Sequence, residues 1–381
     1  MLSSYDDYPV HQTSHPIAKT VSGDLNHYDR YFFNGCTRDT RIFFASAMGL
    51  YPNRHVADAA FSVVVDGGTV DARQINVHAS CRAPHDRAEA TTVGPIEVEV
   101  LEPLAALRVA VDAPEHGIKA DLTFVRRTAP IQEPHFFHQV GNRVIMDSTR
   151  MTQFGGWEGW IEVDGELTDL APGETLGCRD RSWGVRRVGE RGPEGAPVAD
   201  PQFFWLWSPI NFETFATHFD VNELSDGRRW HETGMVGLVA QQGGNGPEPA
   251  EAMRSVDYRL EWRPGTRAIA WAEIDLAPWH GEPSTIRLEP LFDWHMSGVG
   301  YLHPEWSHGV WKGEHEVGGD RWDLPVGDLT LPHHAHIQTI VKATSTGGLG
   351  AHEGLGILEQ LVIGRHTPTG LEGYFDGFIP D

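Results

Sequence analysis

The densest group of chemically competent side chains lies near the middle of the chain, in residues 177–186 (GCRDRSWGVR), which hold four charged side chains and a tryptophan. On an extended strand, alternation places Arg179 and Arg181 on one face and Asp180 on the other. We expect the two arginines to flank Asp180 and keep it ionised, so Asp180→Asn should destabilise the protein. The cluster is either a buried ion network joining two halves of the molecule or the charged floor of an active site.

A second candidate pair is His218-Phe219-Asp220. On a strand, the imidazole and the carboxylate share a face, so they could serve together as a general acid and base. The alternative is a surface pair without a catalytic role.

Glu359 lies between Ile357 and Leu361 on one face of a predicted strand. Desolvation on this otherwise apolar stripe would raise its pKa and make it a proton donor. The alternative is a carboxyl group at a barrel mouth that is merely hydrogen-bonded.

Histidines are also dense near the C-terminus, in residues 332–336 (PHHAH). Only His334 and His336 would share a strand face, and no third ligand follows at a defined spacing, so we expect no metal site there. The aromatic and imidazole-rich segment from Tyr301 to Trp311 fits pocket lining or packing better than a catalytic motif.

The elements that must position these residues are predominantly strands. Apolar and polar residues alternate in 118–124, in the hairpin 96–111 and in the hairpin 255–276, with turns at Glu102-Pro103 and at residues 263–266. Forty-two glycines and 25 prolines punctuate these short segments. This pattern predicts an all-β protein of antiparallel barrels or sandwiches.

Length and punctuation predict two domains. A chain of 381 residues exceeds one ordinary core. Glycines and prolines interrupt any periodicity between Val188 and Pro201. We therefore expect one domain over residues 1–190, ending in the charged stretch, and a second over residues 200–381.

Charge and cysteine content limit the partners. A formal charge of -23 opposes binding to nucleic acid or to an anionic membrane surface. The three cysteines form no metal-binding spacing and indicate no disulfide framework, which fits a cytoplasmic protein. The first residues lack a secretory signal, and no apolar run has membrane-spanning length, so we expect no membrane insertion. Dinucleotide, P-loop and serine-hydrolase motifs are absent, so we expect no cofactor. Formation of a homo-oligomer stays open.

Residues 177–184 resemble the G-x-R-D-x-S-W-G signature of the superfamily that contains hydroxyneurosporene synthase (carotenoid 1,2-hydratase), AttH-like proteins and kievitone hydratase. Residues 31–35 and 49–53 resemble its opening segment, residues 159–165 the strand and turn before its central motif, and residues 354–359 its closing Gly-x-Gly-x-x-Glu strand.

The resemblance implies two packed lipocalin-like antiparallel β-barrel domains and chemistry without a redox cofactor. Characterised relatives add or remove water, and some distant fungal members guide pericyclic ring closures. The segment His218-Phe219-Asp220 would be the counterpart of a proposed acid site, with histidine where a tyrosine is expected.

We therefore expect a lyase or hydratase that acts by acid/base chemistry on a hydrophobic or aromatic small molecule, such as a terpenoid or phenylpropanoid, bound between two barrels. The alternatives are an isomerase or cyclising enzyme, and a carrier of an apolar ligand. The expected catalytic residues are Asp220, His218, Glu359 and Asp180. The expected substrate contacts are Trp183, Trp205, Trp207, Tyr31, Asn34 and Arg181.

Overall fold

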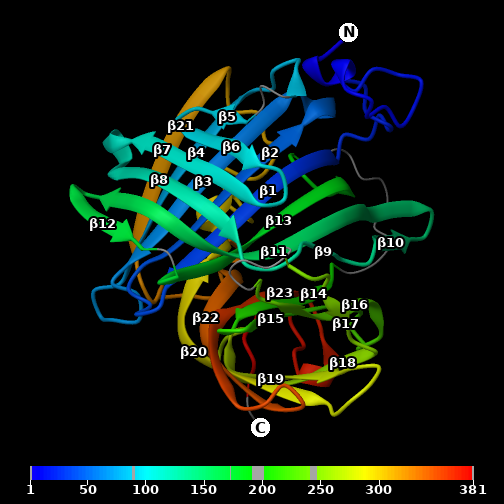
Figure 1. Ribbon diagram of the computed structural model, residues 1–381, viewed down its shortest axis with the longest axis vertical. Coiled ribbons are helices and arrows are strands. Elements are labelled where there is room, and N and C mark those ends of the chain that lie inside the picture. The colour runs from blue at the N-terminus through cyan, green and yellow to red at the C-terminus, as the bar shows by residue number, and fades with distance from the viewer. Residues whose placement is uncertain (1, 88–90, 172, 191–200, 241–246, 380–381) are drawn as a thin grey trace.

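The computed structural model describes residues 2–87, 91–171, 173–190, 201–240 and 247–379, and it is built of strands (Figure 1). Within these ranges the helical segments are short 3-10 turns: η1 (Ser4–Asp7), η2 (Pro52–Arg54), η4 (Pro114–His116), η5 (Met296–Val299), η6 (Pro332–His334) and η7 (Thr367–Thr369). The predicted all-β class is confirmed. None of these helical segments has the length and apolar composition needed to cross a bilayer.

The first sheet has fourteen described strands, and neighbouring strands pair antiparallel in the order β21-β4-β3-β2-β1-β13-β11-β8-β7-β6-β5, with β9, β10 and β12 also on β11. It curls through the upper part of Figure 1. Its strands are β1 (His27–Thr37), β2 (Phe43–Tyr51), β3 (Val56–Val65), β4 (Arg73–Arg82), β5 (Thr92–Val93), β6 (Ile96–Glu102), β7 (Ala106–Ala113), β8 (Ile118–Arg126), β9 (Ile131–Gln132), β10 (Phe136–Val140), β11 (Arg143–Val163), β12 (Glu166–Leu170), β13 (Thr175–Arg186) and β21 (His315–Asp323).

The second sheet has nine described strands in the order β17-β16-β15-β14-β23-β22-β20-β19-β18. In Figure 1 it curls round in the lower part of the molecule. Its strands are β14 (Phe203–Asn211), β15 (Phe215–Glu223), β16 (Arg229–Leu238), β17 (Glu251–Ala252), β18 (Ser255–Trp262), β19 (Ile269–Ala277), β20 (Ser284–His295), β22 (His336–Gly347) and β23 (His352–Ile363).

The chain changes from the first sheet to the second between β13 and β14. The predicted linker falls in this segment, but residues 191–200 of it lie outside the described residues. Strand β21 comes from the second half of the chain and pairs with β4 at the edge of the first sheet. The division into residues 1–190 and 200–381 stays a prediction, and β21 is one strand that crosses it.

Alternation along the strands separates three cores. One face of the first sheet encloses Phe33, Leu122 and Trp157, and one face of the second encloses other apolar side chains such as Phe219 and Leu288. The opposite faces pack against each other in a third cluster, which we call the interface. Its apolar members from both sheets include Phe32, Phe154, Cys178, Trp207, Ile340 and Ile357.

Glycine is needed where β1 and β13 approach closely. A Cβ atom at Gly177 would lie 2.0 Å from the carbonyl oxygen of Asn34, so a larger residue would push the two strands apart. The same carbonyl accepts a hydrogen bond from the indole nitrogen of Trp157 at 2.8 Å. The first glycine of the charged stretch therefore has a packing role, and it holds the following residues against the interface.

Candidate active site

The centre of the interface is the guanidinium of Arg150 on β11, which is 8% exposed. It donates hydrogen bonds to both carboxylate oxygens of Glu133, at 2.6 to 2.9 Å, and to Asp220 on β15 of the second sheet. Thr152 also donates to Glu133, at 2.6 Å. One cation therefore serves two buried carboxyl groups from different sheets.

The pKa values of the two carboxyl groups are shifted in opposite directions. Burial disfavours the charged form of Glu133, but Arg150, His218 and their hydrogen bonds outweigh burial and hold its pKa well below the usual range. Asp220 is fully buried, and burial together with the neighbouring negative charge of Glu133 raises its pKa well above the usual range despite Arg150. A proton is therefore favoured on Asp220 over Glu133, and the Oδ1 of Asp220 accepts a hydrogen bond from the indole of Trp205 at 2.8 Å.

Two imidazole side chains line the same cluster. His218 lies on the same face of β15 as Asp220, and its Nε2 is 3.0 Å from the indole nitrogen of Trp207 and 3.2 Å from Glu133. His231 on β16 stacks on Phe136 with ring centroids 3.7 Å apart. Burial, then the positive charge of Arg150, lowers the pKa of His231 to about 3. The Nδ1 of His218 and the Nε2 of His231 are buried without a hydrogen-bond partner.

Asp180 on β13 is half-buried and faces the interface, two residues from buried Cys178. Burial raises the pKa of Asp180 to about 7, against the attraction of Arg150 and with the repulsion of Glu133. The predicted clamp by its sequence neighbours is wrong, because they face away and have other partners. Arg179 donates to Gln153 at 2.7 and 2.9 Å, and Arg181 pairs with Asp29.

Glu359 on β23 also faces the interface and is 2% exposed. Its Oε1 is 2.6 Å from Nε2 of His336, and its Oε2 accepts a hydrogen bond from Gln338 at 2.7 Å. Glu359 therefore has apolar neighbours on its own strand, but polar groups of the adjacent strand β22 form hydrogen bonds with it. Glu359 is a hydrogen-bonded carboxyl group, as in the alternative considered from the sequence.

The predicted substrate contacts divide between two faces. Trp205 and Trp207 lie at the interface with Arg150 5.1 and 5.5 Å from their ring centres, and Asn34 faces Gln338 across it. The other three, Trp183, Tyr31 and Arg181, lie on the opposite face of the first sheet, with Arg181 stacked 3.9 Å from the ring centre of Tyr31. Substrate binding by any of the six stays a prediction, and only the first three are near the acids.

The sequence-based prediction missed Glu133 and Arg150. The sequence signal for Arg150 was its spacing from Phe154. On a strand, residues four apart lie on the same face, so Arg150 shares the interface face with Phe154. That signal has meaning only once β11 is known to pair with β13, with Arg150 opposite Ser182 and Thr152 opposite Asp180. Glu133 follows the two-residue strand β9 and carries no pattern of its own.

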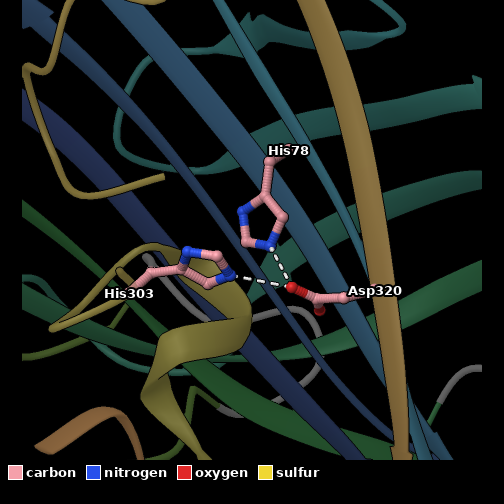
Figure 2. A group of neighbouring side chains, drawn as sticks. All are labelled: His78, His303 and Asp320. Carbon is pink, nitrogen blue, oxygen red and sulfur yellow. Dashed lines mark hydrogen bonds and ion pairs between the residues drawn. The ribbon is translucent and has the colours of Figure 1, made fainter. Parts of the chain in front are cut away.

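Figure 2 shows a second cluster, in which His78 of β4 and His303 both point toward Asp320 of β21. The Nε2 of His303 is 2.7 Å from Asp320, and its Nδ1 accepts the backbone N–H groups of Glu305 and Trp306 at 3.0 and 2.9 Å. Because Nδ1 is an acceptor, Nε2 carries the proton and cannot offer a lone pair to a metal. The geometry therefore fits an anchor for the loop between η5 and β21 better than a metal centre.

Two other arrangements resemble metal sites. Glu133, Asp220 and His231 bring ligand atoms within 4.8 Å of one another, but the guanidinium of Arg150 already supplies a cation there. The predicted shared strand face of His334 and His336 is wrong, because His334 ends η6 while His336 begins β22. Their partners also differ, since His334 contacts the carbonyl of Asp328.

A cleft of about 640 Å³ opens elsewhere, between the ends of several strands of the first sheet. Its lining mixes both signs of charge, as in Arg41, Asp66 and Arg73, and includes none of the acids described above. The size of a cleft alone therefore does not identify the active site. We place the candidate site at the interface, where the buried acids lie.

Solved structures of other proteins resemble this one at low sequence identity. An AttH protein from Nitrosomonas europaea is 14% identical with a TM-score of 0.51, covering 93% of this chain and 98% of that chain. CghA, in a structure with Sch210972, is 11% identical with a TM-score of 0.50, covering 89% of each chain. Kievitone hydratase from Nectria haematococca is 10% identical with a TM-score of 0.48, covering 95% and 96%.

The likeness to AttH confirms the predicted AttH-like fold of two lipocalin-like units. No curated protein matches the sequence significantly. Residues 2–372 match a family of unknown function (DUF8625), and the chain belongs to that family.

Proposed function

We propose that the protein is a cofactor-independent enzyme that transfers protons at the interface between its two sheets, acting as a lyase or hydratase on a hydrophobic or aromatic small molecule. The observation that carries this proposal is a surplus of carboxyl groups. Glu133, Asp180, Asp220 and Glu359 converge there, and Arg150 contacts two of them, Glu133 and Asp220, directly. Burial raises the pKa of Asp180 to about 7 and raises the pKa of Asp220, so the site can hold a proton near neutral pH.

Asp180 is the acid best placed for substrate, because it is half-buried whereas Asp220 is fully enclosed. A pKa near 7 suits a group that must both donate and accept a proton. Asp220 and Glu133 with Arg150 would hold the surrounding charge constant. Glu359 and His218 are supporting polar groups in this scheme.

The chemistry balances without another reactant than water. The carboxylic acid of Asp180 gives its proton to an alkene carbon, and the π electrons form the new C–H bond. Water then adds to the cation, and the carboxylate of Asp180 takes the proton that the water loses. The ring faces of Trp205 and Phe136 favour the positive charge of the intermediate. Elimination of water is the reverse sequence.

The structure of the fold neighbour CghA with Sch210972 supports ligand binding by a protein of this fold. A terpenoid-like or phenylpropanoid-like substrate fits the aromatic walls. Three unpaired, buried cysteines support a reducing compartment such as the cytoplasm.

The test is a mass-spectrometric screen of terpenoid and phenylpropanoid alkenes and alcohols in D2O. A hydratase product gains the mass of D2O, a proton-transfer isomerase product exchanges hydrogen for deuterium, and a cyclised product keeps the mass of its substrate. A carrier leaves every compound unchanged. Cyclisation without deuterium uptake, unaffected by Asp180→Asn, would replace the proposal with the cyclising alternative.

A further inference from the structure

Two arginines next to the candidate site, buried Arg30 and half-buried Arg186, lack a carboxylate partner. Arg30 on β1 is 2% exposed, and the Nε and Nη2 atoms of Arg186 on β13 are buried without a hydrogen-bond partner, as is Nε of Arg30. Arg30 contacts neutral acceptors, the ring of His308 at 2.5 Å and the carbonyl of Val299 at 3.1 Å. Among the described residues, neither guanidinium lies within ion-pair distance of a carboxylate, whereas Arg150 contacts two. Buried guanidinium groups normally bind carboxylate or phosphate through several N–H donors.

The carboxyl group that both arginines influence is Asp58, and it is already engaged. Its oxygens accept hydrogen bonds from Tyr51 at 3.1 Å and from the backbone N–H of Gly309 at 2.6 Å. Burial raises the pKa of Asp58 to about 6, although both arginines act to lower it. One acid against two guanidinium groups leaves an excess of positive charge.

Tyr301 covers the pair and connects it to the acids. Its ring centre lies 4.8 Å from the guanidinium carbon of Arg30 and 5.4 Å from that of Arg186. The same ring meets His336, the partner of Glu359, with centroids 4.7 Å apart. The Nδ1 of His336 is buried and unpartnered as well. Tyr301 is half-buried and belongs to the loop between η5 and β21, so a ligand would contact the arginines once this ring moves aside.

We propose that Arg30 and Arg186 form a subsite for a carboxylate group of the substrate, which would therefore be a hydrophobic carboxylic acid. This inference rests on the proposed function, because it uses the same interface. The carboxylate would replace the ring of Tyr301 beside the two guanidinium groups. The hydrophobic part would extend toward Trp205 and Asp180, since Asp180 already interacts electrostatically with Arg30.

The competing explanation is structural. Arg186 also stacks on Tyr28 at 4.6 Å, so it could simply anchor aromatic rings. A plain inorganic anion is the other competitor. Ligand binding separates the three, because an aromatic anchor gains nothing from a carboxylate and an anion site gains nothing from a hydrophobic body.

The experiment compares 4-phenylbutanoate with 4-phenylbutanol, which share a carbon skeleton, by calorimetry and thermal shift on the full chain. We expect wild type to bind the carboxylate at least about tenfold more tightly, the effect of one charge-assisted contact. Arg186→Met and Arg30→Met should abolish that preference. Arg82→Gln is the matched control, because Arg82 is an exposed arginine paired with Glu314 in the same loop region.

Equal binding of the acid and the alcohol by wild type, or a preference that survives Arg186→Met, would overturn the subsite. Stabilisation by inorganic phosphate equal to that by 4-phenylbutanoate would reassign the pair to an inorganic anion. Should Arg30→Met fail to fold, Arg186→Met decides, because the residue at 186 ends its strand and is only half-buried.

The outcomes also separate this inference from the proposed chemistry. Asp180→Asn should keep the preference for the carboxylate while losing turnover. If no compound is turned over and the preference still depends on Arg186, the acid/base proposal fails and the subsite stands. If turnover is found but 4-phenylbutanoate and 4-phenylbutanol bind equally, the subsite fails and the acid/base proposal stands.

Discussion

Two buried carboxylate clusters in this protein differ in how many partners each acid has. Inside the second sheet, Glu223 is alone with Arg229 at 3.0 Å, Tyr258 at 2.9 Å and His366 at 2.9 Å. Burial opposes its ionisation, but these three donors outweigh it and lower its pKa. At the interface, Arg150 is shared by two carboxyl groups, Glu133 and Asp220, and the pKa values of Asp180 and Asp220 are raised. A carboxyl group with several hydrogen-bond donors, such as Glu223, stays ionised and stabilises the fold. Carboxyl groups that share one cation can instead retain a proton.

The largest effect should come from breaking the satisfied cluster. Glu223→Gln leaves a buried part of Arg229 without its charge partner and should lower the free energy of unfolding by about 3 kcal/mol, the lower end for such a break because Arg229 also pairs with Glu232 and Asp257. Chemical denaturation measures this. Turnover per folded molecule should not change, and a stable variant would show that Glu223 is no anchor.

Removing Asp180 from the interface should lower turnover and leave stability unchanged or higher, the opposite of the result expected for Glu223. Asp180→Asn should lower turnover by about 100-fold, the usual contribution of a positioned acid or base. Its stability at pH 7 should equal or exceed that of wild type, because no arginine loses a hydrogen bond in the described structure. This reverses the destabilisation expected from the sequence. Ser182→Ala, two residues along the same face of β13, is the control; a loss of stability in Asp180→Asn alone would restore the ion-network interpretation.

The raised pKa of Asp180 should also make the stability of the protein depend on pH, and we expect this effect to be smaller than the loss of turnover. The folded pKa of Asp180 is raised from 3.8 to about 7, so the folded state holds a proton that the unfolded state has lost. Stability therefore falls as pH rises from about 4 to about 7. Glu133 has the opposite sign and acts only below its ordinary value of 4.5. Thermal melts of wild type and Asp180→Asn should converge near pH 4 and separate toward pH 7; parallel curves would exclude the raised pKa.

The smallest effect concerns the loop that carries Tyr301. His303→Ala removes the bond to Asp320 seen in Figure 2 and the acceptor of the Glu305 and Trp306 amides. We expect a loss of about 1 kcal/mol and faster hydrogen exchange confined to this loop. His315→Ala, at the exposed start of β21, should leave exchange unchanged. Exchange that stays slow in His303→Ala would show that the loop is held by other contacts.

Local alternation predicted the strands well because each strand carries its own period. Residues 118–124 belong to β8, and the two predicted hairpins are β6 with β7 and β18 with β19. The same logic placed His218 and Asp220 on one face. What it could not supply is a partner from another strand: Arg150 for Asp220, Gln338 for Glu359, or Asp29 for Arg181. Those pairs depend on register and on how two sheets pack, which no single segment encodes.

Strand β21 limits how this protein can be cut. It is paired with β4 over nine residues, from His315 opposite Cys81 to Asp323 opposite Arg73. A fragment ending near residue 190 would expose the edge of β4, with its backbone N–H and C=O groups free to pair with another chain. Separately produced halves should therefore aggregate or reassemble by strand complementation, and a split between them would make β21 the recognition element.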